Sequence, residues 1–576
     1  MTQLPFPEPA VAEHEARLLA LADRLYVRAG LRPMSKVLFT LSRLLWIARE
    51  HTLRPEVDAL VAGYARARAA GRAPVDDYDL ATCLADAGDE LPALVATVEG
   101  LRRAPGDVLG LALDTLLRGR WEAGEGLGTF ITPEEVTGPA SRLAGALAHG
   151  VAGRVGDPCS GTGRFGLAMA VHHPGPVWLS DTSSLACGFA RINADLQQRD
   201  ATVHPTPDGL VDPAVTALAG TFAAIGTNPP FGARKYPWSD GLHLALGGLE
   251  AAVGTTPDTP GEPATLFLLR DLDLLAEGGV LAIVLPSGPV HSPGLVTALH
   301  AWEAARGRSV AVHAVIDLPT VTFSLAGTVA RTTLLVLRIG ADLPLWAGVA
   351  QQIGFSVKSR RRLDDGAPND LDRFVDAILA DAPTDGLVRL PSWRGLPTLQ
   401  PGALGLQREA GTPLSERATL QREFAEAGAF HISVLDVDPY GAVDVVQASA
   451  NAPTTRPLAC QPGDVLLSLL NPRIWRVTVV PDLPGRWTCS PEFAVLRPAA
   501  DPWTLWAQLH TASARAQLRA VAKGTSSSRQ RVPKDSLAEL VLPEVAPVPA
   551  AVSEGLADRY RADLHRAALV GGLSGD

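Results

Sequence analysis

Asn228, Pro229, Pro230 and Phe231 form a tetrapeptide whose residue types suit the binding of a planar amino group. Two consecutive prolines remove two backbone donors and fix two φ angles, which makes the segment rigid and leaves its carbonyls free. The Asn228 side-chain oxygen and the Pro229 carbonyl could accept both hydrogens of an exocyclic amine, while the Phe231 ring could stack on the attached heterocycle. The alternative is a rigid turn with a buried phenylalanine.

A glycine-rich segment, DPCSGTGRFG from Asp157 to Gly166, lies upstream of this tetrapeptide. It has the spacing G-x-G-x-x-G at Gly161, Gly163 and Gly166, between an apolar segment and a helical pattern. Glycines at this spacing let the backbone turn tightly and approach a nucleotide-like ligand, although a tight turn without a ligand needs glycine too. The segment therefore predicts either a cofactor loop or a simple turn.

Asp181 ends the next apolar segment, VWLSD, about twenty residues after the glycines. A carboxylate at the end of the second strand of such a unit suits the two hydroxyls of a ribose. Asp181, Thr182 and Ser183 are also residue types that cap helices. Asp181 is therefore expected to bind a cofactor, to cap a helix, or to do both.

The elements around these motifs alternate between short apolar segments and helical patterns, which is typical of a doubly wound α/β sheet. The expected strands are GRVGDP, VWLSD, ATVHP, FAAIGTNPP, VLAIVLPSG, HAVIDLP and TTLLVLRIG. The last two lie close together in the sequence and favour an antiparallel pair at one edge of the sheet. Asp181 and the tetrapeptide each stand at the end of an expected strand.

The chain has 576 residues, too many for one ordinary domain, and its 47% hydrophobic residues exclude wholesale disorder. Residues 1–125 have helical apolar spacing and predict a helical domain, and the α/β domain follows at 126–345. A helical pattern and a Pro/Gly-rich stretch predict a helical extension and linker at 346–395. Residues 396–545 are richer in strand patterns, and 546–576 predict one helix. The expected fold is multidomain α/β, with a C-terminal α+β domain and a tail helix.

The net charge of -10 does not favour nucleic acid as a partner, so such binding would need basic residues that are concentrated locally. One run near the C-terminus has six basic residues and no acidic residue, and it also contains Ser526 as a small donor for phosphate. A solvated loop is the alternative. The basic residues are Arg515, Arg519, Lys523, Arg529, Arg531 and Lys534.

The five cysteines include no C-x-x-C pair, so no metal site is expected. The first residues have no basic n-region followed by an apolar region, and the longest apolar runs are strand-sized. These features predict a soluble cytoplasmic protein that does not span a membrane.

Together, the glycine loop, Asp181 and the NPPF tetrapeptide resemble the S-adenosylmethionine-dependent amino-methyltransferases of DNA. The order of the motifs resembles gamma-class N6-adenine methyltransferases, and in particular the modification subunits of type I restriction–modification systems. The resemblance covers about residues 126–380. It implies an S-adenosylmethionine-binding doubly wound sheet in which Asn228, Pro229, Pro230 and Phe231 are catalytic.

Further segments add residues to this resemblance. TPDGLVDP implies that Asp208 lies near the cofactor adenine, and the block LPTVTFSLAGTVARTTLLVLR implies Phe323 as a second face for a flipped base. GTFITPEEV looks like the segment that precedes the glycine loop in this family and lies near the methionine part of the cofactor. The cofactor-binding residues implied are Phe130, Thr132, Pro133, Asp157, Gly161, Gly163, Asp181 and Asp208.

Two C-terminal segments, GDVLLSLLNPRIWRVTVV and KGTSSSRQRVPKDSLAELVLPEV, resemble one target-recognition domain of a type I specificity subunit, which reads DNA sequence. The resemblance implies double-stranded DNA as a partner and contact with DNA through the basic run and Ser526. Only one copy is present, so a bipartite target would need a homodimer. A separate nuclease or translocase subunit is left open as a further partner.

The expected function is transfer of a methyl group from S-adenosylmethionine to N6 of a flipped adenine in duplex DNA, within a restriction–modification or phage-defence system. Cys159 lies inside the glycine loop, where its thiol would face cofactor rather than base, which argues against a cytosine-C5 enzyme with a nucleophilic thiolate. The alternatives are an N4-cytosine DNA methyltransferase, a protein or RNA amino-methyltransferase, and a non-catalytic DNA-binding defence component.

Overall fold

The computed structural model describes residues 9–69, 74, 76, 78–104, 108–117, 131–230, 235–250, 253–324, 330–358, 361–363, 366–404, 411–426, 428–453, 456–472, 474–522 and 531–573. The chain forms two compact units, Met1–Gln400 and Pro401–Asp576.

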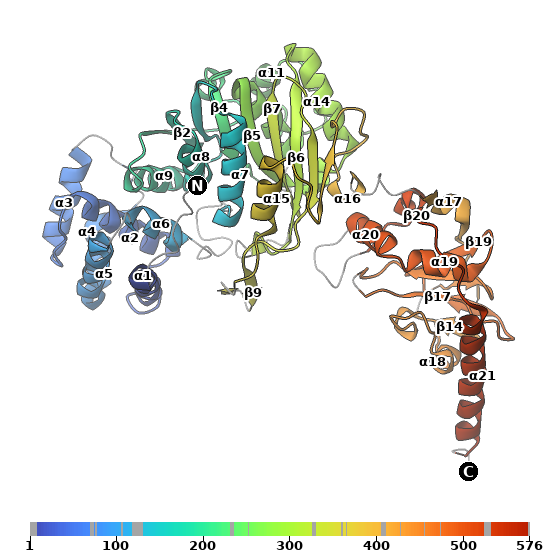
Figure 1. The fold of residues 1–576 in the computed structure, drawn as a ribbon. Helices are drawn as coiled ribbons and strands as arrows, with labels where there is room; N and C mark the ends of the chain where they lie inside the picture. Colours follow the sequence, from blue (N-terminus) through green and yellow to red (C-terminus); the bar gives the residue numbers. More distant parts are fainter. Residues whose placement is uncertain are drawn as a thin grey trace. The chain divides into compact units, whose positions relative to one another are not determined.

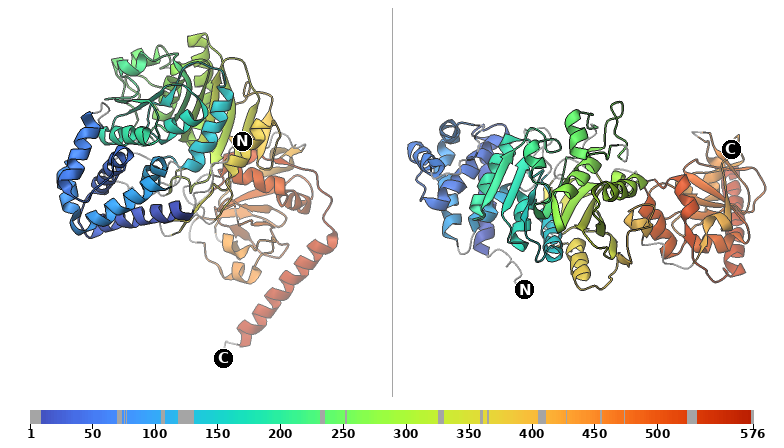
Figure 2. Two further views of the ribbon diagram at one scale, coloured as in Figure 1. Left: turned by 60° about the vertical axis from the view of Figure 1, so that its left-hand side comes forward. Right: turned by 90° about the horizontal axis from the view of Figure 1, so that it is seen from above.

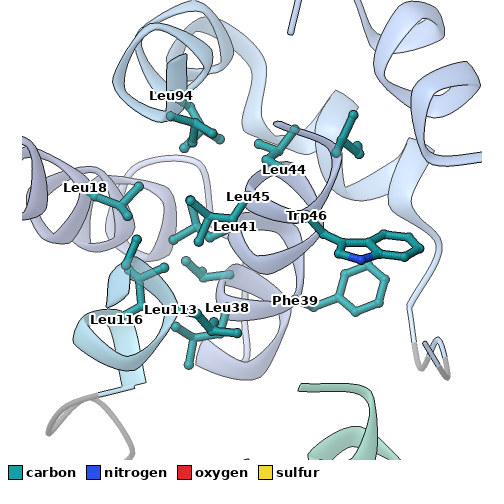
Figure 3. Packing of buried hydrophobic residues seen from close by; sticks show 14 of the residues in the cluster. Leu18, Leu38, Phe39, Leu41, Leu44, Leu45, Trp46, Leu94, Leu113 and Leu116 are labelled. Carbon is teal, nitrogen blue, oxygen red and sulfur yellow. The ribbon is translucent and has the colours of Figure 1, made fainter. Parts of the chain in front are cut away.

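The N-terminal part is helical, as predicted. Its helices are α1 (Pro9–Val27), α2 (Met34–Glu50), α3 (Val57–Ala69), α4 (Leu80–Ala87), α5 (Leu91–Arg103) and α6 (Val108–Leu117). Helix α2 is the central element, because nearly all of its residues from Met34 to Ala48 are buried. Leucines of α1, α5 and α6 surround it, and Leu41, Leu45 and Leu113 lie in the middle of this core (Figure 3).

This helical bundle is not separate from the sheet that follows it. Buried residues of α9 (Ser184–Leu196), among them Phe189 and Ile192, belong to the same hydrophobic cluster as the bundle. Trp46 Nε1 of α2 also donates a hydrogen bond of 3.0 Å to Asp195 of α9. The bundle and the sheet therefore share a core, a contact that helical spacing in the sequence did not reveal.

The described residues of the first unit form a nine-stranded sheet with the order β11-β8-β6-β7-β5-β4-β1-β2-β3 (Figure 1). The strands are β1 (Arg154–Asp157), β2 (Val177–Asp181), β3 (Ala201–Pro205), β4 (Phe222–Thr227), β5 (Leu275–Pro286), β6 (Val310–Leu318), β7 (Thr332–Ile339), β8 (Leu345–Val349) and β11 (Leu387–Leu390). Neighbours from β5 to β3 run parallel, so the predicted doubly wound sheet is confirmed. The order reverses at β1, which lies between β2 and β4.

The predicted antiparallel pair of the last two apolar segments is confirmed in β6 and β7, but its predicted position at a sheet edge is wrong. Strand β7 pairs antiparallel with both β5 and β6. Strand β8 continues the sheet beyond β6 in parallel, and β11 pairs antiparallel with β8. Because β6 is buried along almost its whole length, its open side needs a neighbour that satisfies its backbone groups.

Helices cover both faces of the sheet. Helices α7 (Glu134–Leu147), α8 (Arg164–His172) and α15 (Asp370–Leu379) share a core cluster with alternate residues of β5, which face one side. Helix α12 (Pro263–Leu274) contacts β5 and α14 (Pro293–Arg306) and covers the other side. The short helices of this unit are α10 (Pro213–Thr216), α11 (Asp240–Leu246) and α13 (Ser287–Val290).

The structure of residues 346–395 differs from the predicted helical extension and linker. Helix α15 is the expected helix, but β8 and β11 extend the main sheet, and β9 (Ser356–Lys358) forms a hairpin with β10 (Arg361–Leu363). Trp393, which follows β11, is fully buried and donates to the Val310 carbonyl at 3.1 Å. This stretch is therefore part of the first unit's core.

The second unit combines small sheets with helices, as predicted. Its described residues form sheets with the orders β13-β19-β16-β17, β14-β18-β15 and β12-β20. The strands are β12 (Thr412–Pro413), β13 (Ala418–Gln421), β14 (Phe430–Ile432), β15 (Leu458–Cys460), β16 (Val465–Ser468), β17 (Val477–Val479), β18 (Trp487–Cys489), β19 (Phe493–Pro498) and β20 (Val541–Leu542). The helices are α16 (Pro401–Leu404), α17 (Leu414–Arg417), α18 (Val445–Ala450), α19 (Pro502–Leu509), α20 (Ala512–Val521) and α21 (Ala550–Leu573).

The predicted tail helix is α21, which Figure 2 shows as one continuous helix before the C-terminus. Leu556, Tyr560 and Leu564 pack against the core cluster of β14, β15 and β18. The Tyr560 hydroxyl also accepts the Val443 N–H at 3.1 Å, which fixes the helix on its unit. In the described part of the chain, no helix combines the length and the apolar character that a membrane span requires.

Candidate active site

A cavity of about 280 Å³ lies at the carboxyl ends of β1, β2 and β4. This is the place where the strand order of the sheet reverses, and doubly wound sheets bind ligands there. The cavity volume is close to the lower end of small-molecule sites, roughly 300–1,000 Å³. The lining residues are Ile131, Thr132, Asp157, Pro158, Cys159, Ser160, Gly161, Thr162, Arg164, Phe165, Asp181, Thr182, Thr206, Gly209, Asn228, Pro229, Pro230 and Phe267.

The glycine loop joins β1 to α8 and forms one wall of the cavity. Gly161 and Gly163 have φ angles of 51° and 87°, a region that side-chain-bearing residues rarely adopt. A Cβ atom on Gly163 would lie 3.3 Å from the Cα atom of Ala190, so the loop closely approaches α9. Ser160 N–H donates to the Ser180 carbonyl at 2.7 Å and fixes the loop on the end of β2.

Asp181 lies at the end of β2 and is 9% exposed. Its Oδ2 accepts the Gly161 N–H and its Oδ1 accepts the Ser183 N–H, both at 2.8 Å. Burial raises the pKa of Asp181, against these backbone hydrogen bonds, which lower it. Ser183, and not Asp181, caps α9. The Asp181 carboxylate therefore holds the glycine loop, and its remaining lone pairs face a cavity in which hydroxyl donors would fit.

Ser160 offers a test of whether a polar ligand fits this wall. Its hydroxyl oxygen is buried in the cavity lining and has no hydrogen-bond partner among the described residues. A buried polar atom without a partner is costly, which favours a ligand or water that completes it. Together with the glycine loop and Asp181, this donor set fits the expected S-adenosylmethionine.

Two buried carboxyl groups lie next to the glycine loop. Asp157 is 2% exposed, and its Oδ1 accepts the Cys159 N–H at 2.9 Å. Burial raises the pKa of Asp157 to about 7, although the nearby Thr227 side chain and the hydrogen bond from the Cys159 N–H lower it. Burial raises the pKa of Asp271 on α12 well above its usual range, and the nearby Asp157 adds to the rise. Neither oxygen of Asp271 has a partner among the described residues, which also favours its neutral form.

Cys159 lines the cavity inside the glycine loop. Burial raises the pKa of its thiol well above the usual range, and the carboxylates of Asp271 and Asp157 add to the rise. The thiolate needed for nucleophilic catalysis is therefore disfavoured here. In the described part of the chain, His, Cys, Asp and Glu side chains form no group of three or more that could hold a metal ion.

Asn228, Pro229 and Pro230 directly follow β4 and line the same cavity as the glycine loop. Every residue of β4 is buried, so packing on both faces of the sheet fixes the position of the strand end. Phe231 lies outside the described residues. The structure thus brings the first three residues of the tetrapeptide together with Asp181 and the glycine loop.

Other expected site residues do not line the cavity. Pro133 and Gly163 are the N-caps of α7 and α8. Phe323 is 1% exposed and packs in the core cluster of α7, α8 and α15, so its ring has no open face for a base in this conformation. Phe130 lies outside the described residues.

Asp208 lies beside the cavity, since its neighbours Thr206 and Gly209 line it. Its carboxylate accepts the Tyr236 hydroxyl, and its other oxygen accepts the Leu210 N–H at 2.9 Å. Burial and then the hydrogen bond to Asp208 raise the pKa of Tyr236. The carboxylate expected near the cofactor adenine thus holds the segment that follows the tetrapeptide.

Sequence reasoning missed several residues of the cavity, among them Thr162, Arg164 and Phe267. Arg164 occupies a variable position of the glycine motif, so the motif gives no signal for it. Phe267 lies in the apolar pattern of α12, where an ordinary core residue is expected. A Cβ atom on Gly209 would lie 3.3 Å from the Phe267 ring, so the missing side chain leaves this ring beside the cavity.

Residues 104–343 match the family model described as N-6 DNA Methylase. The family resemblance predicted from the glycine loop, Asp181 and the tetrapeptide is confirmed by this match. It supports a DNA methylase of the N6 class and implies S-adenosylmethionine as the methyl donor.

The chain is also similar to the type II methyltransferase M.MamI of Microbacterium ammoniaphilum, with 28% identity over 304 residues, which cover 44% of this chain and 83% of the relative. The type I restriction–modification methyltransferase subunit from Streptococcus thermophilus has 17% identity and a TM-score of 0.48, and the match covers 66% of this chain and 96% of that chain. The type IIG restriction endonuclease BpuSI has 12% identity and a TM-score of 0.45, covering 95% of this chain and 75% of that chain.

The basic run that was expected to contact DNA lies in the second unit, outside the segment that matches the methylases. Arg515 stacks over Trp475, with its guanidinium carbon 5.4 Å from the ring centroid. Arg531 pairs with Glu492 at 2.7 Å, and burial lowers the pKa of Lys534. Arg519 belongs to α20. Lys523, Ser526 and Arg529 lie outside the described residues.

Proposed function

We propose that this chain is a DNA methyltransferase that transfers a methyl group from S-adenosylmethionine to N6 of an adenine flipped out of duplex DNA. One observation carries the proposal: Asn228 and Pro229 line the same cavity as the glycine loop and Asp181. An amide and a proline carbonyl at that place suit an exocyclic amine, and the opposite wall suits a nucleoside. The match to the N-6 DNA methylases supports the same chemistry.

The residues of the tetrapeptide activate a poor nucleophile. The lone pair of adenine N6 is delocalised into the ring, so it attacks only when charge can develop on nitrogen. The Asn228 Oδ1 and the Pro229 carbonyl accept its two hydrogens, and this interaction strengthens as positive charge grows in the transition state. When bound, S-adenosylmethionine supplies a methyl group on a sulfonium as the electrophile. The rigid prolines hold the acceptors in place for a direct displacement.

The cofactor-binding residues of the proposal come from several separate places in the chain. Asp181 accepts the ribose hydroxyls, and the glycine loop with Ser160 lies against the cofactor. Thr132 borders the methionine part, and Asp208 lies on the adenine side, where the Phe267 ring offers a stacking face. Phe231 is assigned to the target base, where stacking on an aromatic ring contributes about 1–3 kcal/mol.

Residues 396–545, nearly all of which belong to the second unit, are proposed to read the DNA sequence, and the tail helix follows them. The two segments that suggested such a domain meet in space, since Val532 N–H donates to the Leu469 carbonyl at 2.8 Å. Arg531, at the edge of this contact, lies opposite Leu470. The basic run with Ser526 is assigned to the phosphate backbone. The setting that we propose is a restriction–modification system, as the resemblance of the sequence motifs implies.

Transfer of labelled methyl groups from S-adenosylmethionine to duplex DNA tests the proposal. The full-length chain should label DNA, and digestion to nucleosides should yield N6-methyladenine. Asn228→Ala should lower the rate by at least about a hundredfold, because it removes one of two acceptors that act in the transition state. Asn228→Asp, which keeps an acceptor oxygen, should retain more activity.

Calorimetric titration with S-adenosylmethionine is the matched control, because Asn228→Ala should leave cofactor affinity nearly unchanged. Equal labelling by wild type and Asn228→Ala would refute the catalytic assignment. N4-methylcytosine in the digest would show that the target base is cytosine and would refute the assignment to adenine. Labelling of protein or RNA instead of DNA, or no binding of S-adenosylmethionine at all, would overturn the proposal.

A further inference from the structure

A buried arginine stands at the first turn of α8, directly after the glycine loop. Arg164 is 6% exposed, its Nη1 donates to the Thr132 carbonyl at 3.2 Å, and its Nη2 donates to the Asp114 carbonyl at 2.7 Å. A cation at a helix N-terminus is opposed by the helix dipole. Its place therefore requires a nearby negative charge, and the Asp114 carboxylate lies 3.4 Å from Arg164 Nε.

Asp114 comes from α6, the last helix of the N-terminal bundle, and it reaches the glycine loop by a second route. Its Oδ1 accepts a hydrogen bond of 3.1 Å from the Asn193 amide, which also donates to the Thr162 carbonyl at 3.2 Å. Thr132 and Thr162 both line the cavity. One carboxylate of the bundle is thus connected to two walls of the proposed cofactor site.

Packing keeps α6 where its carboxylate can act. A Cβ atom on Gly110 would lie only 3.3 Å from the Leu196 carbonyl, so α6 approaches the end of α9 closely. Leu113 and Leu117 belong to the bundle core that includes α9, and the cavity residue Ile131 packs against the same core. The contact is therefore built from backbone fit and apolar burial as well as from charge.

We propose that the N-terminal helical bundle positions the segments that line the cofactor site, and that Asp114 is the positioning residue through which it acts. The inference rests on the proposed function, because it assigns the cavity to S-adenosylmethionine. Asp114 does not line the cavity; it holds Arg164 and Asn193, which hold the segments that do. Without the carboxylate, the buried Arg164 charge loses its counter-ion, and both segments lose the positions that the ligand needs.

The effect is measured as the affinity of the full-length chain for S-adenosylhomocysteine, the non-reactive product form of the cofactor, by calorimetry. Asp114→Ala should raise the dissociation constant at least about tenfold, the factor that corresponds to one lost charge-assisted hydrogen bond of about 1.5 kcal/mol. Asp114→Asn, which keeps the size and an acceptor for Asn193, should raise it less. Hydrogen exchange at residues 160–166 should be faster in both variants.

Asp86→Asn is the matched control, because it removes an ion pair of 2.7 Å with Lys36 within the same bundle but away from the cavity. It should leave the dissociation constant unchanged. In the double variant Asp114→Ala with Arg164→Met, affinity should be no lower than in Asp114→Ala alone, if the carboxylate acts through this arginine.

The outcomes separate the inference from the function on which it rests. A wild-type chain that binds no S-adenosylhomocysteine would overturn the proposed function. Wild-type binding together with an unchanged dissociation constant in both Asp114 variants would overturn the inference alone. If Asp114→Ala does not fold, Asp114→Asn decides the matter. An equal loss of affinity in Asp86→Asn would reduce Asp114 to a general stabilising residue and also overturn the inference.

Discussion

Replacement of Asp157 by asparagine should change how the stability of the first unit depends on pH. The carboxyl is buried, which raises its pKa from the ordinary 3.8 to about 7. Between these values the folded chain carries a proton on Asp157 that the unfolded chain has lost. The free energy of unfolding therefore falls as pH rises through this window, and the fall ends above pH 7.

The size of the effect follows from the pKa values. Each pH unit inside the window lowers the free energy of unfolding by about 1.4 kcal/mol. The titration of Asp157 should therefore lower it by about 2 kcal/mol between pH 5.5 and 8.0. Asp157→Asn abolishes this dependence, while its amide oxygen can still accept the Cys159 N–H. The difference in unfolding free energy between the variant and wild type should thus shift by about 2 kcal/mol in favour of the variant from pH 5.5 to pH 8.0. Asp271 is present in both proteins, so its contribution to the pH dependence largely cancels in the difference between them.

Hydrogen exchange of β1 and α8 as a function of urea, without cofactor, measures this difference locally. It is run at pH 5.5 and 8.0 and corrected for the intrinsic exchange rates. Asp258→Asn, on an exposed turn, is the control and should follow wild type at both pH values. If Asp157→Asn loses as much stability as wild type between pH 5.5 and 8.0, the carboxyl is not protonated in the folded chain and the reasoning is wrong.

Two further changes test single contacts. Tyr236→Phe removes the hydroxyl that donates to Asp208 and should lower kcat/KM for DNA methylation about tenfold, because the loss of one hydrogen bond of about 1.5 kcal/mol loosens the segment after the tetrapeptide. An unchanged kcat/KM would argue against a role of this contact in holding that segment. Arg497→Met leaves the buried carboxylate of Asp464 without the two hydrogen bonds of 3.0 Å that it now accepts. The unfolding free energy of the second unit should fall by about 2 kcal/mol, and the loss is no larger because water can reach this half-exposed position and partly replace the arginine. Urea-dependent hydrogen exchange of β16 measures the second change, and a loss below about 0.5 kcal/mol would contradict the expectation.

The sequence predicts the parts of the fold that depend on local pattern. Strands β4 to β7 have strong apolar segments, and the bundle helices have clear helical spacing. Strand β11 at the sheet edge and its neighbour β8 are four or five residues long and lie among prolines and glycines, so their pairing partners rather than their own pattern decide their structure. Composition alone therefore predicts a linker at 346–395, where the structure has two strands of the main sheet.

The candidate site shows the same limit at the level of single residues. Glycine spacing and the tetrapeptide identify positions because few residue types can replace glycine or proline. Arg164 and Asp114 carry no such mark, since charged residues occur everywhere on helices. Their contact spans 50 residues and exists only because α6 packs on α9. Phe323 illustrates the reverse case, in which a segment pattern suggests a base contact and packing buries the ring.

Charge along the chain is likewise a different quantity from charge in space. The run from Arg515 to Lys534 contains no acidic residue, yet the fold brings Glu492 to Arg531 at 2.7 Å. Such an exposed pair contributes only about 0–1 kcal/mol, so a DNA phosphate could replace Glu492 at little cost. The pair would then hold Arg531 near its binding position before DNA arrives and reduce the entropy lost on binding. A basic run that is partly neutralised in the free protein is thus consistent with the phosphate contact proposed for it.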